Sequence, residues 1–206
     1  MYDGKGSFAN QEQLSGMEDI LKQNKISIRH FLKDDWGIQL KIESLKFRWD
    51  IKRVLSKTTI SSRYKKVYEK GNAGVLLFDE KGIQSTLYAH SSIDKEEDHY
   101  PYYGKGQNSN FAKECVLLRE PQSEREFSTF EIRIRGQEIS IDRCVDSEAK
   151  LLEEFFVRYG YNRSIDGELY LYTDRYPCSS CMSVMLQFRD KFKNIGINVY
   201  HDGKKN

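Results

Sequence analysis

The chain has 206 residues, of which 38% are hydrophobic, and its 33 Lys and Arg against 31 Asp and Glu give a formal net charge of +2. This length suits one domain with an appendage, and an aromatic content of 13% argues against wholesale disorder. No apolar run approaches the roughly 18–20 residues that cross a bilayer, and residues 1–16 lack the apolar core of a signal peptide. The near balance of charge neither requires nor excludes a nucleic-acid partner, because binding depends on where basic residues cluster.

Residues 1–50 are interpreted as an N-terminal lead-in segment, followed by a domain at residues 51–206. In the lead-in, apolar residues from Met17 to Phe31 are spaced as in one or two short amphipathic helices. The run W-G-I-Q-L-K-I-E-S-L-K-F-R-W, residues 36–49, alternates well enough to be a strand, with a helix as the alternative.

The first half of the main domain begins with a predicted basic helix over residues 56–70. The run V-L-L-F-D-E-K-G-I-Q-S-T-L-Y-A-H, within residues 74–90, then predicts a hairpin of two strands that turn at D-E-K-G. The polar segment at residues 91–114 predicts an exposed loop, and a loop of this length inside a compact domain usually serves a function. Three tyrosines and a lysine in this loop could form a platform that stacks unpaired bases with a nearby phosphate contact: Tyr100, Tyr102, Tyr103 and Lys105. The alternative is an ordinary loop without such a role.

The second half of the domain alternates strands and helices. A strand pair is expected over residues 130–141, and a helix from Asp146 to Tyr159 carries a broad apolar face. A strand over residues 167–174, a helix after the P-C-S-S-C turn and a strand over residues 195–200 complete the pattern. A strand–helix–strand unit with so short a crossover implies parallel strands, so the fold class is α/β with a mixed sheet.

Two of the four cysteines, Cys178 and Cys181, form a C-x-x-C motif at a predicted helix start. A tight pair with two scattered single cysteines, Cys115 and Cys144, indicates metal binding or catalysis more than a disulfide framework. Helix N-termini stabilise thiolates, because the helix dipole and free N–H groups favour negative charge. Two alternatives stay open: a redox-active pair, and a structural zinc knuckle completed by Cys115 and Cys144.

A carboxylate accompanies this motif at the start of the preceding predicted helix. Zinc deaminases need three protein ligands, a water molecule and a nearby carboxylate that is not a ligand, and their signature is H-x-E followed by P-C-x-x-C. Here the second half of the signature matches in full as P-C-S-S-C, and the first half reads D-S-E. Glu148 is therefore the candidate catalytic residue, with Cys178 and Cys181 as candidate Zn2+ ligands.

The run R-C-V-D-S-E-A-K-L-L-E-E-F, followed by G-E-L-Y-L-Y-T-D-R-Y-P-C-S-S-C-M-S-V-M, resembles bacterial toxin deaminases of the cytidine deaminase-like superfamily. These are C-terminal toxin domains of polymorphic, interbacterial toxin systems. The chain is most similar to the branch with D-S-E or D-T-E in place of H-x-E, some of whose members act on single-stranded DNA. The resemblance is strongest over residues 142–202, and it implies a sheet of about five strands flanked by helices, with zinc between two helix N-termini.

The third metal ligand is left open between three residues. Asp146 stands where the signature has His, and carboxylate can bind zinc, but two thiolates and a carboxylate would make the metal a weaker Lewis acid. His90, at the end of the second hairpin strand, would supply a neutral imidazole or hold the base, and Asp146 would then orient a ligand from behind. Cys144 is the third option.

The resemblance also implies a substrate, a setting and partners. The implied reaction is hydrolytic deamination of cytosine to uracil, most simply in single-stranded DNA, with RNA, double-stranded DNA or a free nucleotide as alternatives. A non-catalytic zinc module that binds nucleic acid or a partner is the rival from another class. The implied toxin is secreted or delivered as the C-terminal part of a larger protein, acts in the target-cell cytoplasm, engages no membrane and meets a cognate immunity protein. Candidate substrate-binding residues border the expected pocket: Ser91, Arg175, Tyr176 and Pro177.

Overall fold

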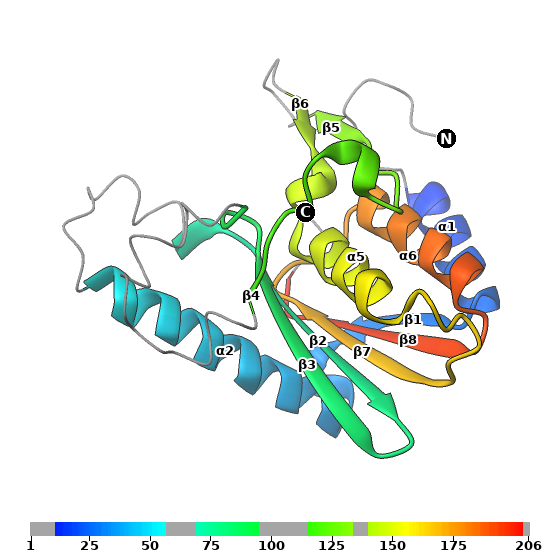
Figure 1. The fold of residues 1–206 in the computed structure, drawn as a ribbon, viewed down its shortest axis with the longest axis horizontal. Helices are drawn as coiled ribbons and strands as arrows, with labels where there is room; N and C mark the ends of the chain where they lie inside the picture. Colours follow the sequence, from blue (N-terminus) through cyan, green and yellow to red (C-terminus); the bar gives the residue numbers. More distant parts are fainter. Residues whose placement is uncertain (1–10, 57–68, 95–114, 134–139, 204–206) are drawn as a thin grey trace.

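The computed structural model describes residues 11–56, 69–94, 115–133 and 140–203 (Figure 1). Most of the predicted basic helix at 56–70 lies outside the described residues. The loop residues expected to stack bases, from Tyr100 to Lys105, also lie outside them. Among the helices that the structure describes, none combines the length and apolar character needed to cross a membrane.

Six strands form one mixed sheet in the order β1-β8-β7-β2-β3-β4. The strands β1, β8 and β7 are parallel to one another, β2 is antiparallel to both β7 and β3, and β3 is parallel to β4. The mixed α/β class is confirmed, with six strands where about five were expected. The bounds are β1 Ile26–His30, β2 Ala73–Glu80, β3 Ile83–His90, β4 Cys115–Val116, β7 Gly167–Thr173 and β8 Ile195–His201. A separate antiparallel pair comprises β5 Glu131–Arg133 and β6 Ser140–Asp142.

Helices cover both faces of the sheet (Figure 1). Alternate residues of β2 define the two faces: Leu76 and Phe78 belong to the cluster that includes the helices on one side, whereas Val75 and Leu77 pack with the helix on the other. The first side carries α1 Gln11–Gln23, α5 Ser147–Tyr159 and α6 Ser179–Lys191, and the second carries α2 Asp35–Ser56. The hydrophobic core is therefore split between two layers on either side of a fully covered central strand.

The strand predicted at residues 36–49 is wrong, because this segment lies within α2. Its buried residues are spaced four, three and four apart, as on one face of a helix: Leu40, Ser44, Phe47 and Ile51. A second apolar set with the same spacing is exposed: Ile38, Ile42, Leu45 and Trp49. Two apolar stripes on opposite sides of one helix produce the alternation that favoured a strand in the sequence.

The segment before residue 51 contributes to the same fold as the later strands. Strand β1 pairs with β8 along its whole length, from Ile26 opposite Ile197 to His30 opposite His201. Helix α2 packs on the sheet through β2 and β7. The lead-in thus supplies an edge strand and the helix that covers one face of the sheet.

The hairpin predicted at residues 74–90 is confirmed as β2 and β3. Its two central turn residues, Lys81 and Gly82, have φ angles of 53° and 90°. Positive φ at both positions is the two-residue turn whose twist matches that of the flanking strands. The amide of Gly82 donates to Asp79 Oδ1 at 2.8 Å, which closes the turn.

Phe155 anchors the layer formed by α5 and α6, and its truncation should be costly. The side chain is fully buried, and its ring contacts those of Phe78, Phe188 and Phe192 at centroid distances of 4.8, 5.2 and 5.4 Å. We expect Phe155→Ala to lower the free energy of unfolding by about 3–5 kcal/mol in urea denaturation. The control Val157→Ala, at an exposed position of the same helix, should change it by less than about 1 kcal/mol. Equal effects at the two positions would contradict this packing.

Candidate active site

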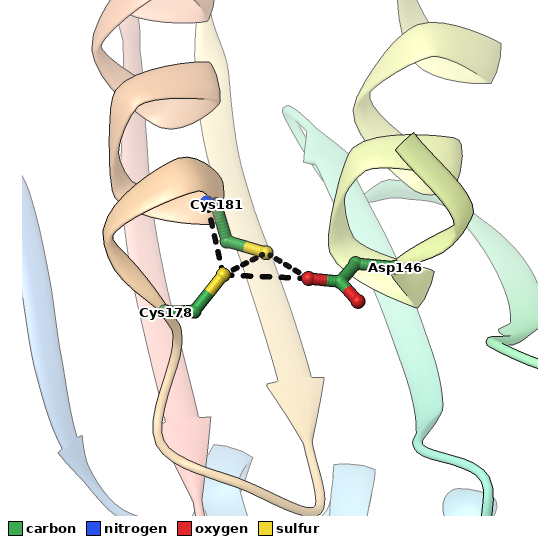
Figure 2. A group of neighbouring side chains, drawn as sticks. All are labelled: Asp146, Cys178 and Cys181. Carbon is green, nitrogen blue, oxygen red and sulfur yellow. Dashed lines mark hydrogen bonds between the residues drawn. The ribbon is translucent and has the colours of Figure 1, made fainter. Parts of the chain in front are cut away.

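Three side chains from two helix N-termini converge on one point (Figure 2). Cys178 and Cys181 lie at the start of α6, and Asp146 immediately precedes α5. Asp146 Oδ2 lies 3.3 Å from Cys178 Sγ and 3.1 Å from Cys181 Sγ, and the two sulfurs are 3.4 Å apart. Of the residues that the structure describes, these form the one group suited in type and spacing to hold a metal ion.

The position of Asp146 has a local cause. It occupies the N-cap of α5 with extended backbone, yet its carboxylate makes no capping hydrogen bond. An N-cap aspartate ordinarily accepts from a backbone N–H of the first turn; here the carboxylate is directed at the two sulfurs instead. Cys178 does cap its helix, because its Sγ accepts from the amide of Cys181 at 3.4 Å. The Asp146 carboxylate therefore contacts the two cysteine sulfurs instead of capping α5.

The donor triangle fits Zn2+. Zinc bonds of about 2.3 Å to sulfur and about 2.0–2.2 Å to oxygen, at tetrahedral angles, separate two sulfurs by roughly 3.8 Å and a sulfur and an oxygen by roughly 3.5 Å. The observed edges of 3.1–3.4 Å are slightly shorter and need only small side-chain adjustments. The hydrogen bond with Cys178, burial and the nearby Asp146 carboxylate hold the pKa of Cys181 well above its ordinary value, so ion binding would displace protons.

Arg143 supplies a positive charge directly beside this cluster. Its Nε donates to Asp146 Oδ2 at 2.9 Å. Burial works to lower the pKa of the guanidinium, but Asp146 and the two cysteines outweigh it and hold the pKa above its ordinary value. No motif in the sequence marks Arg143 as a site residue; its one signal is a basic residue three positions before the aspartate of D-S-E.

Glu148 is buried in the first turn of α5, with only 3% of its surface exposed. Its carboxylate accepts from Thr173 Oγ1 and Ser147 Oγ, each at 2.9 Å, and from Asn72 Nδ2 at 3.2 Å. Burial foremost, and then the negative charge of Asp146, raise the pKa of Glu148 to about 7. A carboxyl group with a pKa near neutrality can both take up and release a proton, which suits a general acid–base.

The other two ligand candidates lie outside the donor group. His90 is buried at the end of β3, and its Nδ1 accepts from the amide of Ser92 at 3.2 Å. Gly71 packs directly on its imidazole, since a Cβ at Gly71 would lie 2.2 Å from His90 Cε1. Cys144 is buried, and the bond from its amide goes to Asp142 Oδ1 at 2.9 Å. Burial raises the pKa of the remaining cysteine, Cys115, to about 12, which keeps this group in the thiol form near neutral pH.

The four predicted substrate-binding residues differ in their burial and in the groups that they contact. Ser91 is paired with Asn72, whose amide donates to Ser91 Oγ at 2.8 Å and whose carbonyl accepts from the Ser91 amide at 2.9 Å. Pro177 is buried, whereas Arg175 is exposed and donates to the carbonyl of Lys70. The hydroxyl of Tyr176 is directed at α1, where it donates to Glu18 Oε1 at 2.7 Å.

A buried carboxyl group beside two cysteines and an aspartate, at paired helix N-termini above a mixed sheet, defines a cytidine deaminase-like hydrolase. The model of the Toxin-deaminase family, described as the BURPS668_1122 family of deaminases, matches residues 53–203, and the chain belongs to this family. It is therefore a deaminase of the toxin class. No curated protein and no solved structure matched the chain.

Proposed function

We propose that the protein is an interbacterial toxin that deaminates cytosine to uracil in single-stranded DNA, using zinc held by Asp146, Cys178 and Cys181. The observation that carries the proposal is the placement of Glu148: a buried carboxyl group that is not one of the three zinc-type donors but lies two residues after one of them, Asp146, in the first turn of α5. This is the arrangement that hydrolytic deamination of a base requires.

The residues of the chain divide the chemistry between them. When bound, the ion supplies Lewis-acid activation of a water molecule. Glu148 takes a proton from the attacking water and delivers protons to N3 of the ring and to the amine on C4. The water oxygen becomes bonded to C4, the C4–N bond breaks, and ammonia leaves with uracil as the product. The hydroxyls of Ser147 and Thr173 hold the carboxylate of Glu148 during these transfers.

Single-stranded DNA is the preferred substrate for two reasons. A base inside a stacked duplex cannot place its C4 beside a buried carboxyl group, so an unpaired or flipped base is needed. The D-S-E form of the motif is shared with the branch that includes single-stranded DNA deaminases. RNA, double-stranded DNA and a free nucleotide are the outcomes against which the assay must discriminate.

Asp146 is the proposed third ligand, and Arg143 offsets the extra negative charge that a carboxylate ligand brings to the metal. Two thiolates and a carboxylate carry one more negative charge than two thiolates and an imidazole. The Arg143 guanidinium, which is hydrogen-bonded to the Asp146 carboxylate, offsets that extra negative charge. The metal would then meet the same local sum of charge as in a site with a histidine ligand.

Metal analysis separates Asp146 from His90. We expect Asp146→Ala to reduce zinc content of the purified protein severalfold and His90→Gln to leave it near one equivalent, because only Asp146 directs a donor atom at the two sulfurs. Zinc is measured by atomic emission after removal of loosely bound metal. The reverse order of the two variants would transfer the ligand role to His90.

The biological setting is part of the proposal. Membership in a toxin family supports a role as a toxin effector domain. We propose in addition that it is delivered as the C-terminal part of a larger toxin, acts in the target-cell cytoplasm and is neutralised by a cognate immunity protein. The damage would be mutation or a lethal load of uracil in the genome of a competitor.

Sequencing of DNA from cells that express the protein and lack uracil repair tests the function. An excess of C-to-T changes over a Glu148→Gln control supports it. Unchanged DNA would redirect the activity to RNA or nucleotides. If the protein were instead a non-catalytic zinc module, the Glu148→Gln variant would remain toxic.

A further inference from the structure

Helix α2 lies almost wholly before the family match at residues 53–203 and on the face of the sheet opposite α5 and α6. One residue of α2, Arg48, nevertheless contacts the segments at the end of β7 and before β2, next to the residues that bind Glu148. Arg48 Nε donates to Asp174 Oδ2 at 2.9 Å, and its Nη2 donates to the carbonyl of Gly71 at 2.5 Å. Lys41, the other α2 cation near this carboxylate, is 4.0 Å from Asp174 Oδ1, which is beyond hydrogen-bond distance.

The two groups that Arg48 binds lie on either side of Asn72: Gly71 precedes it in the chain, and Asp174 binds the residue that follows it, Ala73. The carboxylate that Arg48 holds also accepts from the amide of Ala73 at 2.9 Å, and the amide of Asp174 donates to Asn72 Oδ1 at 3.1 Å. Arg48 therefore fixes the backbone immediately before and after Asn72, together with the strand end that holds its side-chain oxygen. The side chains of Arg48 and Asp174 are only 25% and 17% exposed, so these bonds are partly shielded from water.

The orientation of the Asn72 amide follows from these bonds. Because Oδ1 accepts from the Asp174 amide, Nδ2 must face the opposite way. Its two N–H groups face three acceptors within hydrogen-bond distance, Thr173 Oγ1 at 2.7 Å, Ser147 Oγ at 3.1 Å and Glu148 Oε2 at 3.2 Å. A reversed amide would place its oxygen against the Glu148 carboxylate and its NH2 group against the Asp174 amide, so the bonds to both would be lost.

We infer that Arg48 and Asn72 are positioning residues of the deaminase: α2 holds Asp174 and Gly71 through Arg48, and the segment so fixed presents the Asn72 amide to Glu148. This inference rests on the proposed role of Glu148. It makes the helix outside the family match part of the catalytic apparatus. A displacement of about 1 Å at a catalytic group is enough to lower a rate by about two orders of magnitude.

The test compares Arg48→Gln with Lys46→Gln on a single-stranded oligonucleotide that contains one cytosine. Both variants remove one positive charge from α2, but Lys46 is exposed and pairs with Glu43 within its own helix. We expect Arg48→Gln to lower kcat by about 10- to 100-fold with KM and zinc content unchanged, and Lys46→Gln to match the wild type. Arg48→Lys should fall between them, because one ammonium group cannot reproduce the two directed bonds. Equal kcat for Arg48→Gln and Lys46→Gln would overturn the inference.

A double variant tests whether Arg48 acts through Asn72. If it does, Arg48→Gln/Asn72→Ala should lose no more than about twofold beyond Asn72→Ala alone, because the path is already broken. Losses that multiply would show that the two residues act independently and would overturn the path.

A readout without substrate keeps this inference separable from the proposed function. Hydrogen exchange at the amide of Ala73, which bonds to Asp174, should accelerate in Arg48→Gln and not in Lys46→Gln. Full activity in Glu148→Gln would refute the proposed mechanism, whatever Arg48 does. An inactive Glu148→Gln with unaltered exchange and kcat in Arg48→Gln would refute only the positioning role.

Discussion

Glu148→Gln should abolish deamination while making the zinc-free protein more stable. Loss of the proton-transferring group is expected to lower kcat by about 10²–10⁴-fold. The stability gain follows from burial: the pKa of Glu148 rises from an ordinary 4.5 to about 7 in the folded protein. Ionising it therefore costs the folded state increasing free energy between pH 4.5 and 7, and about 3 kcal/mol above that range. Glutamine removes this cost and keeps an oxygen for Asn72 Nδ2.

Urea denaturation of the two zinc-free proteins at two pH values measures this effect. At pH 8 the variant should exceed the wild type by about 3 kcal/mol, and at pH 4 the two should be equal, because Glu148 is then protonated in both states. The same zinc-free preparations, reloaded with zinc, give the activity. A variant that is less stable at pH 8 would show that Glu148 is held as a structural carboxylate.

Removal of residues 1–50 should prevent folding. The deletion takes away β1, which covers the edge of β8, and most of α2, which covers one face of the sheet. Four buried side chains of that face would meet water: Val75, Leu77, Tyr172 and Tyr200. Each such exposure costs about 1.5–3 kcal/mol, and their sum is comparable with the whole stability of a typical domain, about 5–15 kcal/mol.

Near-UV circular dichroism and urea titration of residues 51–206 measure the consequence. We expect no fixed aromatic signal and no cooperative transition. Addition of a peptide spanning residues 1–50 should restore both, because the missing contacts are then supplied in trans. A fragment that unfolds cooperatively by itself would establish the boundary at residue 51 as a true domain boundary.

Elements whose signals are local could be predicted from the sequence. The β2–β3 hairpin carries its own turn residues, and α5 shows one continuous apolar face between good end residues. The parallel pairing of β7 and β8 follows from a short crossover through α6. For residues 36–49 the sequence pattern favours a strand over the helix that the structure shows, because the exposed apolar stripe of α2 hides the period of the buried one.

The site residues that belong to a sequence motif could be predicted from the sequence. Residues Cys178, Cys181 and Glu148 stand in a spaced signature, and their meeting follows from the strand–helix order. The choice between Asp146 and His90 depends on which side chain turns toward the sulfurs, which is a tertiary property. Asn72 and Arg48 carry no motif; they reach Glu148 through bonds between segments more than 20 residues apart in the chain.

The central claim is that the site deaminates cytosine in single-stranded DNA. Purified zinc-loaded protein is incubated with a single-stranded DNA oligonucleotide containing one cytosine, its RNA counterpart, its duplex form and free cytidine nucleotide, and uracil is quantified by mass spectrometry. We expect uracil with equimolar ammonia from the single-stranded DNA, and none above background with Glu148→Gln. Unchanged cytosine in the single-stranded DNA, with one zinc bound per chain, would contradict it, whichever of the other three substrates is deaminated.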